Sequence, residues 1–156
     1  TPNYPHVDAS GFSIPDSMVA RNSDNITSDS DDDAGIVFET SQVWPQFQCE
    51  LSSNTTTNSD EELVIIDTDS NQIASVSISS NTAGDVITYD SVTLEANETY
   101  AVFQRSSNSR VIGGNDSGGT FTSSDGKLQI TNGYTSGSGF NNTDQFSVVR
   151  IGNINL

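Results

Sequence analysis

Lysine, histidine and cysteine are nearly absent from this chain, with one residue of each among 156: Lys127, His6 and Cys49. A single cysteine forms no intrachain disulfide, and the alternating run Phe47–Leu51 predicts a buried, inert thiol. His6 lies in a proline-flanked stretch, which we expect to be unable to orient a catalytic base. No spacing singles out one carboxylate pair of the kind that glycosidases use. The sequence therefore predicts a protein that is not an enzyme.

Basic charge is scarce as well. Five Lys and Arg stand against 21 Asp and Glu, so the formal net charge is −16. Without a basic patch to neutralise phosphates, we expect no nucleic acid partner. Hydrated carboxylates keep a surface soluble in molar salt, where self-repulsion is strongly screened. The composition is typical of a halophilic protein, and an ordinary acidic extracellular domain is the alternative.

Long apolar runs and helical periodicity are also missing. No segment has 18 consecutive apolar residues, which predicts no membrane span. Apolar residues instead gather in short β-branched runs separated by Ser, Thr, Asn, Gly and Asp. Eight to ten such runs predict an all-β, antiparallel two-sheet β-sandwich, and we favour a jelly roll.

The clearest strand pair is predicted over Glu62–Ser79. An apolar run, Leu63–Ile66, meets the polar segment Asp67–Asn71, and a second β-branched run follows. Asp and Asn bond their own backbone and tolerate left-handed conformations, so this segment predicts a turn rather than an ion site. We therefore expect a β-hairpin in the core of the sandwich.

Two regions are expected. Residues 1–20 hold three of the four prolines, which predicts an extended N-terminal arm. Residues 21–156 form the sandwich. The arm's apolar residues suit packing against its own sandwich or docking on a neighbouring subunit, and the sequence leaves both open.

Several blocks then carry a family resemblance: GIVFETS, SSNTTT, ELVIIDTDSNQIASVSIS, LEANETYAVFQ and FTSSDGKLQITNGY. Over roughly residues 15–155 the chain resembles a β-sandwich module of haloarchaeal viruses and proviruses, found in tail-fibre-like and other virion surface proteins. The resemblance implies a jelly-roll-like fold and a structural or receptor-binding role, as a homotrimer. It supplies no catalytic residues. The chain is shorter than such fibres, which favours a small capsid decoration or turret protein.

Three sets of residues are candidate sites. Four aspartates could serve Ca²⁺, which takes six to eight oxygens, although their spacing does not match an EF-hand and a solvated acidic loop is the alternative: Asp29, Asp31, Asp32 and Asp33. Three aromatic residues are candidates for receptor or glycan contact, with packing in a core or interface as the alternative: Trp44, Tyr134 and Phe140. Strand phase places Trp44 outward if its strand is regular. We predict a loop over residues 133–142 and, within it, an exposed contact loop over residues 134–140. Five N-x-[ST] sequons lie in predicted loops or turns and are candidates for glycosylation: Asn25, Asn54, Asn97, Asn115 and Asn141.

Two functions follow. The first is a virion surface protein that binds other virion proteins through its arm and displays loops to the host S-layer or its glycans. The second is a secreted carbohydrate-binding module of a halophilic archaeon. Neither expectation includes a cofactor other than the candidate Ca²⁺.

Overall fold

The computed structural model describes residues 27–29, 33–44, 47–51, 62–78, 85–89, 92–105, 110–112, 115–116, 120–122, 126, 128–142, 145–146 and 149–151. All elements in these ranges are β-strands, which confirms the all-β class. Within the same ranges no helix is long and apolar enough to cross a membrane. The predicted arm, residues 1–20, lies outside the described residues.

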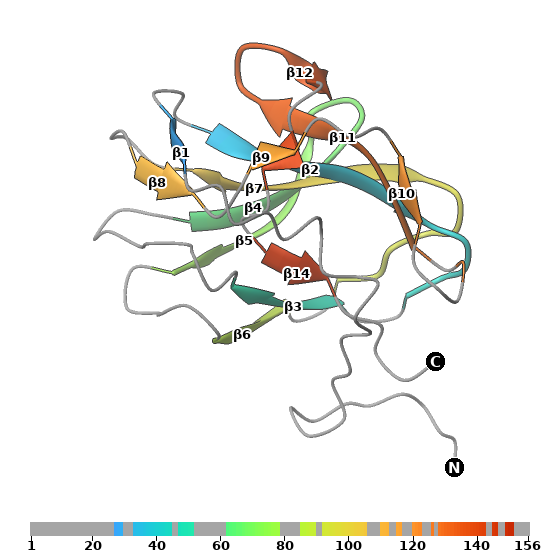
Figure 1. The fold of residues 1–156 in the computed structure, drawn as a ribbon. Coiled ribbons are helices and arrows are strands. Elements are labelled where there is room, and N and C mark those ends of the chain that lie inside the picture. Colours follow the sequence, from blue (N-terminus) through green and yellow to red (C-terminus); the bar gives the residue numbers. More distant parts are fainter. Residues whose placement is uncertain are drawn as a thin grey trace.

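One large antiparallel sheet dominates the fold (Figure 1). Its six strands in spatial order are β10 (Phe121–Thr122), β11 (Leu128–Thr135), β2 (Asp33–Thr40), β7 (Thr99–Arg105), β4 (Glu62–Asp67) and β5 (Gln72–Ser77). The seventh strand, β12 (Gly139–Asn142), pairs with β11. Strands distant in sequence are therefore neighbours in space, since β2 lies between β7 and β11.

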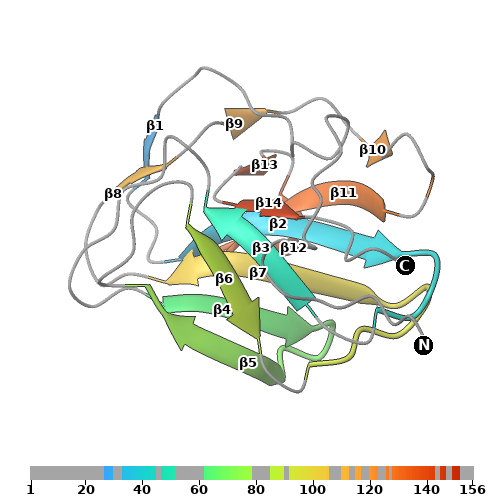
Figure 2. The same cartoon turned by 90° about the horizontal axis from the view of Figure 1, so that it is seen from below.

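The shorter strands form three smaller groups. A three-stranded antiparallel group has the order β14 (Val149–Ile151), β3 (Phe47–Leu51) and β6 (Val86–Tyr89). Two further pairs are β1 (Thr27–Asp29) with β8 (Arg110–Ile112), and β9 (Asn115–Asp116) with β13 (Gln145–Phe146). Figure 2 shows β3 and β6 drawn across the large sheet.

The main core lies between one face of the large sheet and strands β3 and β6. Because successive side chains of a strand point to opposite faces, alternate residues of β2, β4 and β7 reach this core. There they meet Phe47, Cys49, Ile87 and Tyr89. The Tyr89 hydroxyl donates a hydrogen bond of 2.8 Å to the buried Leu63 carbonyl, so a polar bond joins β6 to the large sheet.

The opposite face of the large sheet has a smaller apolar cluster. Its buried members are the intervening residues of the same strands together with one tyrosine, namely Val37, Val64, Ile66, Ala101, Phe103 and Tyr134. Phe140, which is half-buried, packs against them. The large sheet is thus apolar on both faces, which explains why β2, β4 and β7 are buried along nearly their whole length.

The hairpin predicted over Glu62–Ser79 is confirmed. Strands β4 and β5 pair antiparallel from Glu62 opposite Ser77 to Ile66 opposite Gln72, with a register shift near the turn. In the turn, the Ser70 N–H donates to the Asp67 carbonyl at 3.0 Å, and Ser70 has a left-handed φ of 65°.

The sequence predictions for the orientation of Trp44 and for the secondary structure of residues 133–142 are wrong. Trp44 was expected to face outward if its strand is regular, but it is fully buried in the main core, which confirms the alternative of core packing. The expected phase assumes a regular strand through Val43, whereas β3 begins at Phe47 and Trp44 forms an isolated bridge with Leu94. The predicted loop over residues 133–142 is instead the end of β11, a turn at residues 136–138, and β12.

Candidate contact surface

A row of three residues crosses the large sheet and places two aromatic rings together. Gly35 of β2 lies opposite Phe103 of β7 on one side and opposite Tyr134 of β11 on the other. The Phe103 and Tyr134 rings stack with centroids 4.5 Å apart. Phe103 and Tyr134 lie on strands that flank β2, so the whole width of β2 separates their backbones. Their rings meet above Gly35 because glycine has no side chain to keep them apart.

The β11–β12 hairpin adds a third ring to this stack. Phe140 meets Tyr134 edge-on, with centroids 5.5 Å apart and an interplanar angle of 79°. The tight turn is held by Thr135 and Ser138, whose hydroxyl oxygens lie 2.7 Å apart, and the Ser138 N–H donates to the Thr135 hydroxyl at 3.1 Å. The structure therefore brings together two of the aromatic residues that the sequence singled out.

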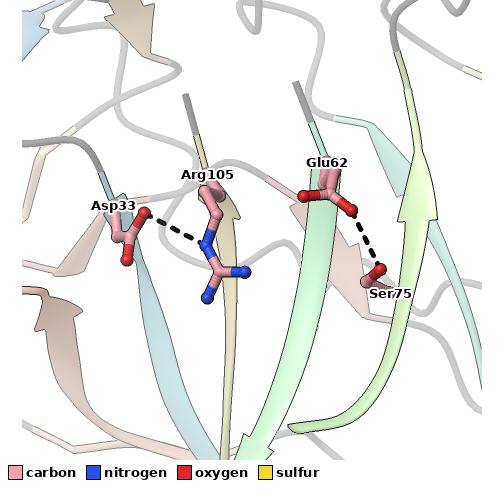
Figure 3. Close-up of polar contacts among 4 residues, drawn as sticks. All are labelled: Asp33, Glu62, Ser75 and Arg105. Atoms are coloured by element: carbon pink, nitrogen blue, oxygen red, sulfur yellow. Dashed lines mark hydrogen bonds and ion pairs between the residues drawn. The ribbon is translucent and has the colours of Figure 1, made fainter. Parts of the chain in front are cut away.

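An ion pair lies beside the aromatic stack. The Arg105 Nε lies 3.6 Å from the Asp33 Oδ1, and the guanidinium carbon lies 5.4 Å from the Phe103 ring centroid. Figure 3 shows Asp33 and Arg105 at the ends of neighbouring strands, with Glu62 on the next strand bonded to Ser75. An arginine near an aromatic face is attracted by the ring quadrupole.

We call Asp33, Phe103, Arg105, Tyr134 and Phe140 the aromatic–ionic cluster. Burial raises the pKa of Tyr134, the nearby Asp33 carboxylate raises it further, and Arg105 opposes both. The phenol therefore stays neutral and able to donate a hydrogen bond at ordinary pH. Sequence reasoning found Asp33, Tyr134 and Phe140 separately, but it missed Phe103 and Arg105 because their proximity depends on strand order.

The candidate calcium ligands are only partly described. Asp31 and Asp32 lie outside the described residues, and Asp29 lies in β1, opposite Arg110. Asp33 is the remaining member, and it pairs with Arg105. Among the described residues no group of three or more His, Cys, Asp or Glu side chains could hold a metal ion. The Ca²⁺ site stays a prediction.

The Asp67 turn uses its carboxylate to bind backbone. The Asp67 Oδ1 accepts hydrogen bonds of 2.9 Å from the N–H groups of both Asp69 and Asn71, and the Asn71 amide reaches Oδ2 at 3.3 Å. The bond from the Asn71 backbone is the largest cause of a pKa below the ordinary 3.8. This geometry confirms the prediction that the polar residues of Asp67–Asn71 form a turn.

The Asp67 carboxylate gives the hairpin a pH dependence. Because its folded-state pKa is lowered, the stability it contributes is present above the unfolded-state value of 3.8 and is lost as the pH falls through the folded-state value. We expect Asp67→Asn to lower the thermal unfolding midpoint at neutral pH, and its curve to meet the wild-type curve in acid. Asp69→Asn, which removes the same charge from the same turn, is the control. Parallel curves for wild type and Asp67→Asn across the acid range would contradict this role.

The sequons fall in different surroundings. Asn97 is exposed in a turn with a left-handed φ of 62°, and its N–H donates to the Thr40 carbonyl at 2.7 Å. Asn141 is exposed but lies in β12, and Asn115 lies in β9, so these two are not in loops as predicted. Asn25 and Asn54 lie outside the described residues.

Cys49 is confirmed as a buried apolar residue. It is fully buried in the main core, and burial raises the pKa of its thiol. A thiol that stays protonated is neither a nucleophile nor a metal ligand at ordinary pH.

No family model matches this chain, and a search of curated proteins finds no match either.

Proposed function

We propose that this chain is a non-enzymatic structural protein on the surface of a haloarchaeal virus virion, as a capsid decoration, a turret or a tail-fibre module. It serves assembly of the particle and attachment to the host surface, and its place is extracellular. Its partners are other virion proteins, bound through the arm of residues 1–20, and two further copies of itself in a homotrimer. Host S-layer protein or glycan is the attachment partner.

One observation carries this proposal. The sequence blocks on which the resemblance to virion surface proteins rests form strands that are neighbours in space. GIVFETS forms most of β2, and LEANETYAVFQ leads into β7. ELVIIDTDSNQIASVSIS is the β4–β5 hairpin, and FTSSDGKLQITNGY runs from β10 into β11. Four of the five blocks thus contribute to one continuous sheet, which supports a shared scaffold rather than scattered similarities of composition.

The finer fold belongs to the same proposal. In it, the three-stranded group β14–β3–β6 and the large sheet are the two layers of a jelly-roll sandwich. The main core supports this arrangement, because it draws residues from both groups. The Tyr89–Leu63 hydrogen bond joins the two layers.

The exposed turn of residues 136–138, which lies beside the aromatic–ionic cluster, is the proposed attachment surface. Exposed turn residues 136–138 lie next to half-buried Phe140, so rigid rings support a small polar tip. The half-buried Phe140 ring gives contact area at little cost in conformational entropy, and the serines and glycine of the turn give adaptable hydrogen bonding. Fully buried Trp44 is withdrawn from this surface.

Deletion of residues 1–20 tests the proposal against the alternative of a secreted carbohydrate-binding module. We expect the deleted protein to keep its strand signal in far-ultraviolet circular dichroism but to lose its trimeric state and its incorporation into particles. A variant whose arm has the same composition in scrambled order is the control for length and charge. Monomeric glycan binding that is the same with and without the arm would overturn the proposal and favour the alternative.

Salt dependence tests the halophilic part of the proposal. With a net charge of −16, self-repulsion acts over about 10 Å at 0.1 M salt but only about 3 Å at 1 M. We therefore expect the thermal midpoint to fall steeply as NaCl is diluted below about 1 M, and choline chloride to restore it equally. Equal stability at low and high ionic strength would contradict a halophilic adaptation. At constant ionic strength, a rise of the midpoint with CaCl₂ alone would indicate a bound Ca²⁺, for which Asp29, Asp31, Asp32 and Asp33 are the candidate ligands.

A further inference from the structure

Strand β5 is an edge strand of the large sheet. It pairs with β4 on its inner side, and no described strand pairs with its outer side (Figure 2). Alternate N–H and C=O groups of an outermost strand point away from the sheet, where they can pair with another chain. At six residues, β5 is longer than β12 with four and β10 with two, which lie at the other end of the sheet.

This strand lacks most features by which proteins block such pairing. Edge strands are commonly protected by charged side chains, by proline or by a bulge. The sequence of β5, QIASVS, has no charge and no proline, and its one register shift lies at the turn end. It belongs to a run without any charged residue from Ser70 to Gly84, although the chain carries a net charge of −16.

We propose that two copies of this chain pair through β5, in an antiparallel ladder about a twofold axis perpendicular to the sheet. The charge pattern identifies the second copy as the occupant. A basic partner would bind the acidic surfaces of the chain, because opposite charges attract. A second copy also has a net charge of −16, so it is repelled by those surfaces and requires a contact strand without carboxylates. Antiparallel pairing also puts the two turns containing Asp67 and Asp69 at opposite ends of the joined edge.

A pair of matched substitutions tests this contact in the full-length chain. Ile73 on β5 and Val43 away from it are the exposed large hydrophobic residues of the described part, with 37% and 45% exposure. Ile73→Lys and Val43→Lys make the same change in net charge, and lysine at an edge opposes strand pairing. In molar salt, sedimentation equilibrium should give wild type and Val43→Lys twice the mass of Ile73→Lys, because the β5 contact doubles whatever assembly the chain otherwise forms. Ile73→Lys should lose that association while keeping its circular dichroism spectrum.

Equal masses of wild type and Ile73→Lys at all concentrations would overturn the proposal. Cross-linking tests it independently of that substitution. If β5 pairs with β5 of a second copy about a twofold axis, either Ala74 or Ser75 lies opposite the same residue of the second copy. Directly opposed residues have Cβ atoms about 4.5–5.5 Å apart. We expect either Ala74→Cys or Ser75→Cys to form an intermolecular disulfide on mild oxidation, while buried Cys49 does not react. No cross-linked dimer from either variant would also refute the contact.

Discussion

Replacing Gly35 by alanine is expected to destabilise the fold by about 3 kcal/mol, the upper part of the usual range for overpacking. A Cβ atom built at Gly35 would overlap the Val102 carbonyl oxygen and lie 2.5 Å from the Phe103 Cα. Both contacts are with the backbone of a central strand, which cannot rotate away as a flexible side chain would. The β2–β7 pairing must therefore open locally, and the stack of Phe103 on Tyr134 opens with it.

The direction of the change in stability tests whether Gly35 is in close contact with β7. Alanine in place of glycine ordinarily stabilises a protein by about 0.4–1 kcal/mol where the native conformation allows it, because the unfolded chain loses freedom. Gly137 is the matched control, since no atom lies within 4 Å of a Cβ built there. In chemical denaturation, Gly35→Ala should lower the free energy of unfolding while Gly137→Ala leaves it unchanged or slightly higher. Equal effects of the two substitutions would contradict the close approach at Gly35.

Trp44→Ala is expected to cost about 3–5 kcal/mol, as for other large aromatic residues removed from a core. The ring is fully buried and stacks on Phe47 with centroids 6.3 Å apart. Its Nε1 is buried without a hydrogen-bond partner in the described part of the chain. Trp44→Phe should therefore cost much less than Trp44→Ala, because it keeps a ring and removes a polar group that burial penalises.

The tryptophan also reports on its own surroundings. It is the only one in the chain, so all tryptophan fluorescence comes from this residue. We expect blue-shifted emission that is protected from iodide quenching in the folded state and becomes red-shifted and quenchable on unfolding. Red-shifted, freely quenched emission from the folded protein would place Trp44 at the surface and restore it as a candidate contact residue.

The parts of the fold that local chemistry determines were predictable from sequence. The β4–β5 hairpin follows from β-branched runs on either side of Asp67–Asn71, and the burial of Cys49 follows from the alternation within β3. Trp44 was not predictable in this way, because its phase was counted along a strand that begins only at Phe47. Residues 133–142 were misassigned because their Gly and Ser content is typical of a loop. The hairpin there depends on the contacts of Thr135 and Tyr134.

The aromatic–ionic cluster needed strand order as well. Residues 33–35, 103–105 and 134 are far apart in sequence and meet only because β2 lies between β7 and β11. One local signal was present: Gly35 interrupts an otherwise apolar strand, and an isolated glycine in a strand often marks a close approach of another backbone. That signal indicates crowding, but it does not identify Phe103 and Tyr134 as the neighbours.

The central claim is that this chain is a component of a virion surface. Quantitative mass spectrometry of density-purified particles, compared with the particle-free culture medium, tests it most directly. Our account predicts that peptides from this chain sediment with the particles in constant proportion to the major capsid protein through successive purifications. Recovery of the chain only in the particle-free medium would contradict it.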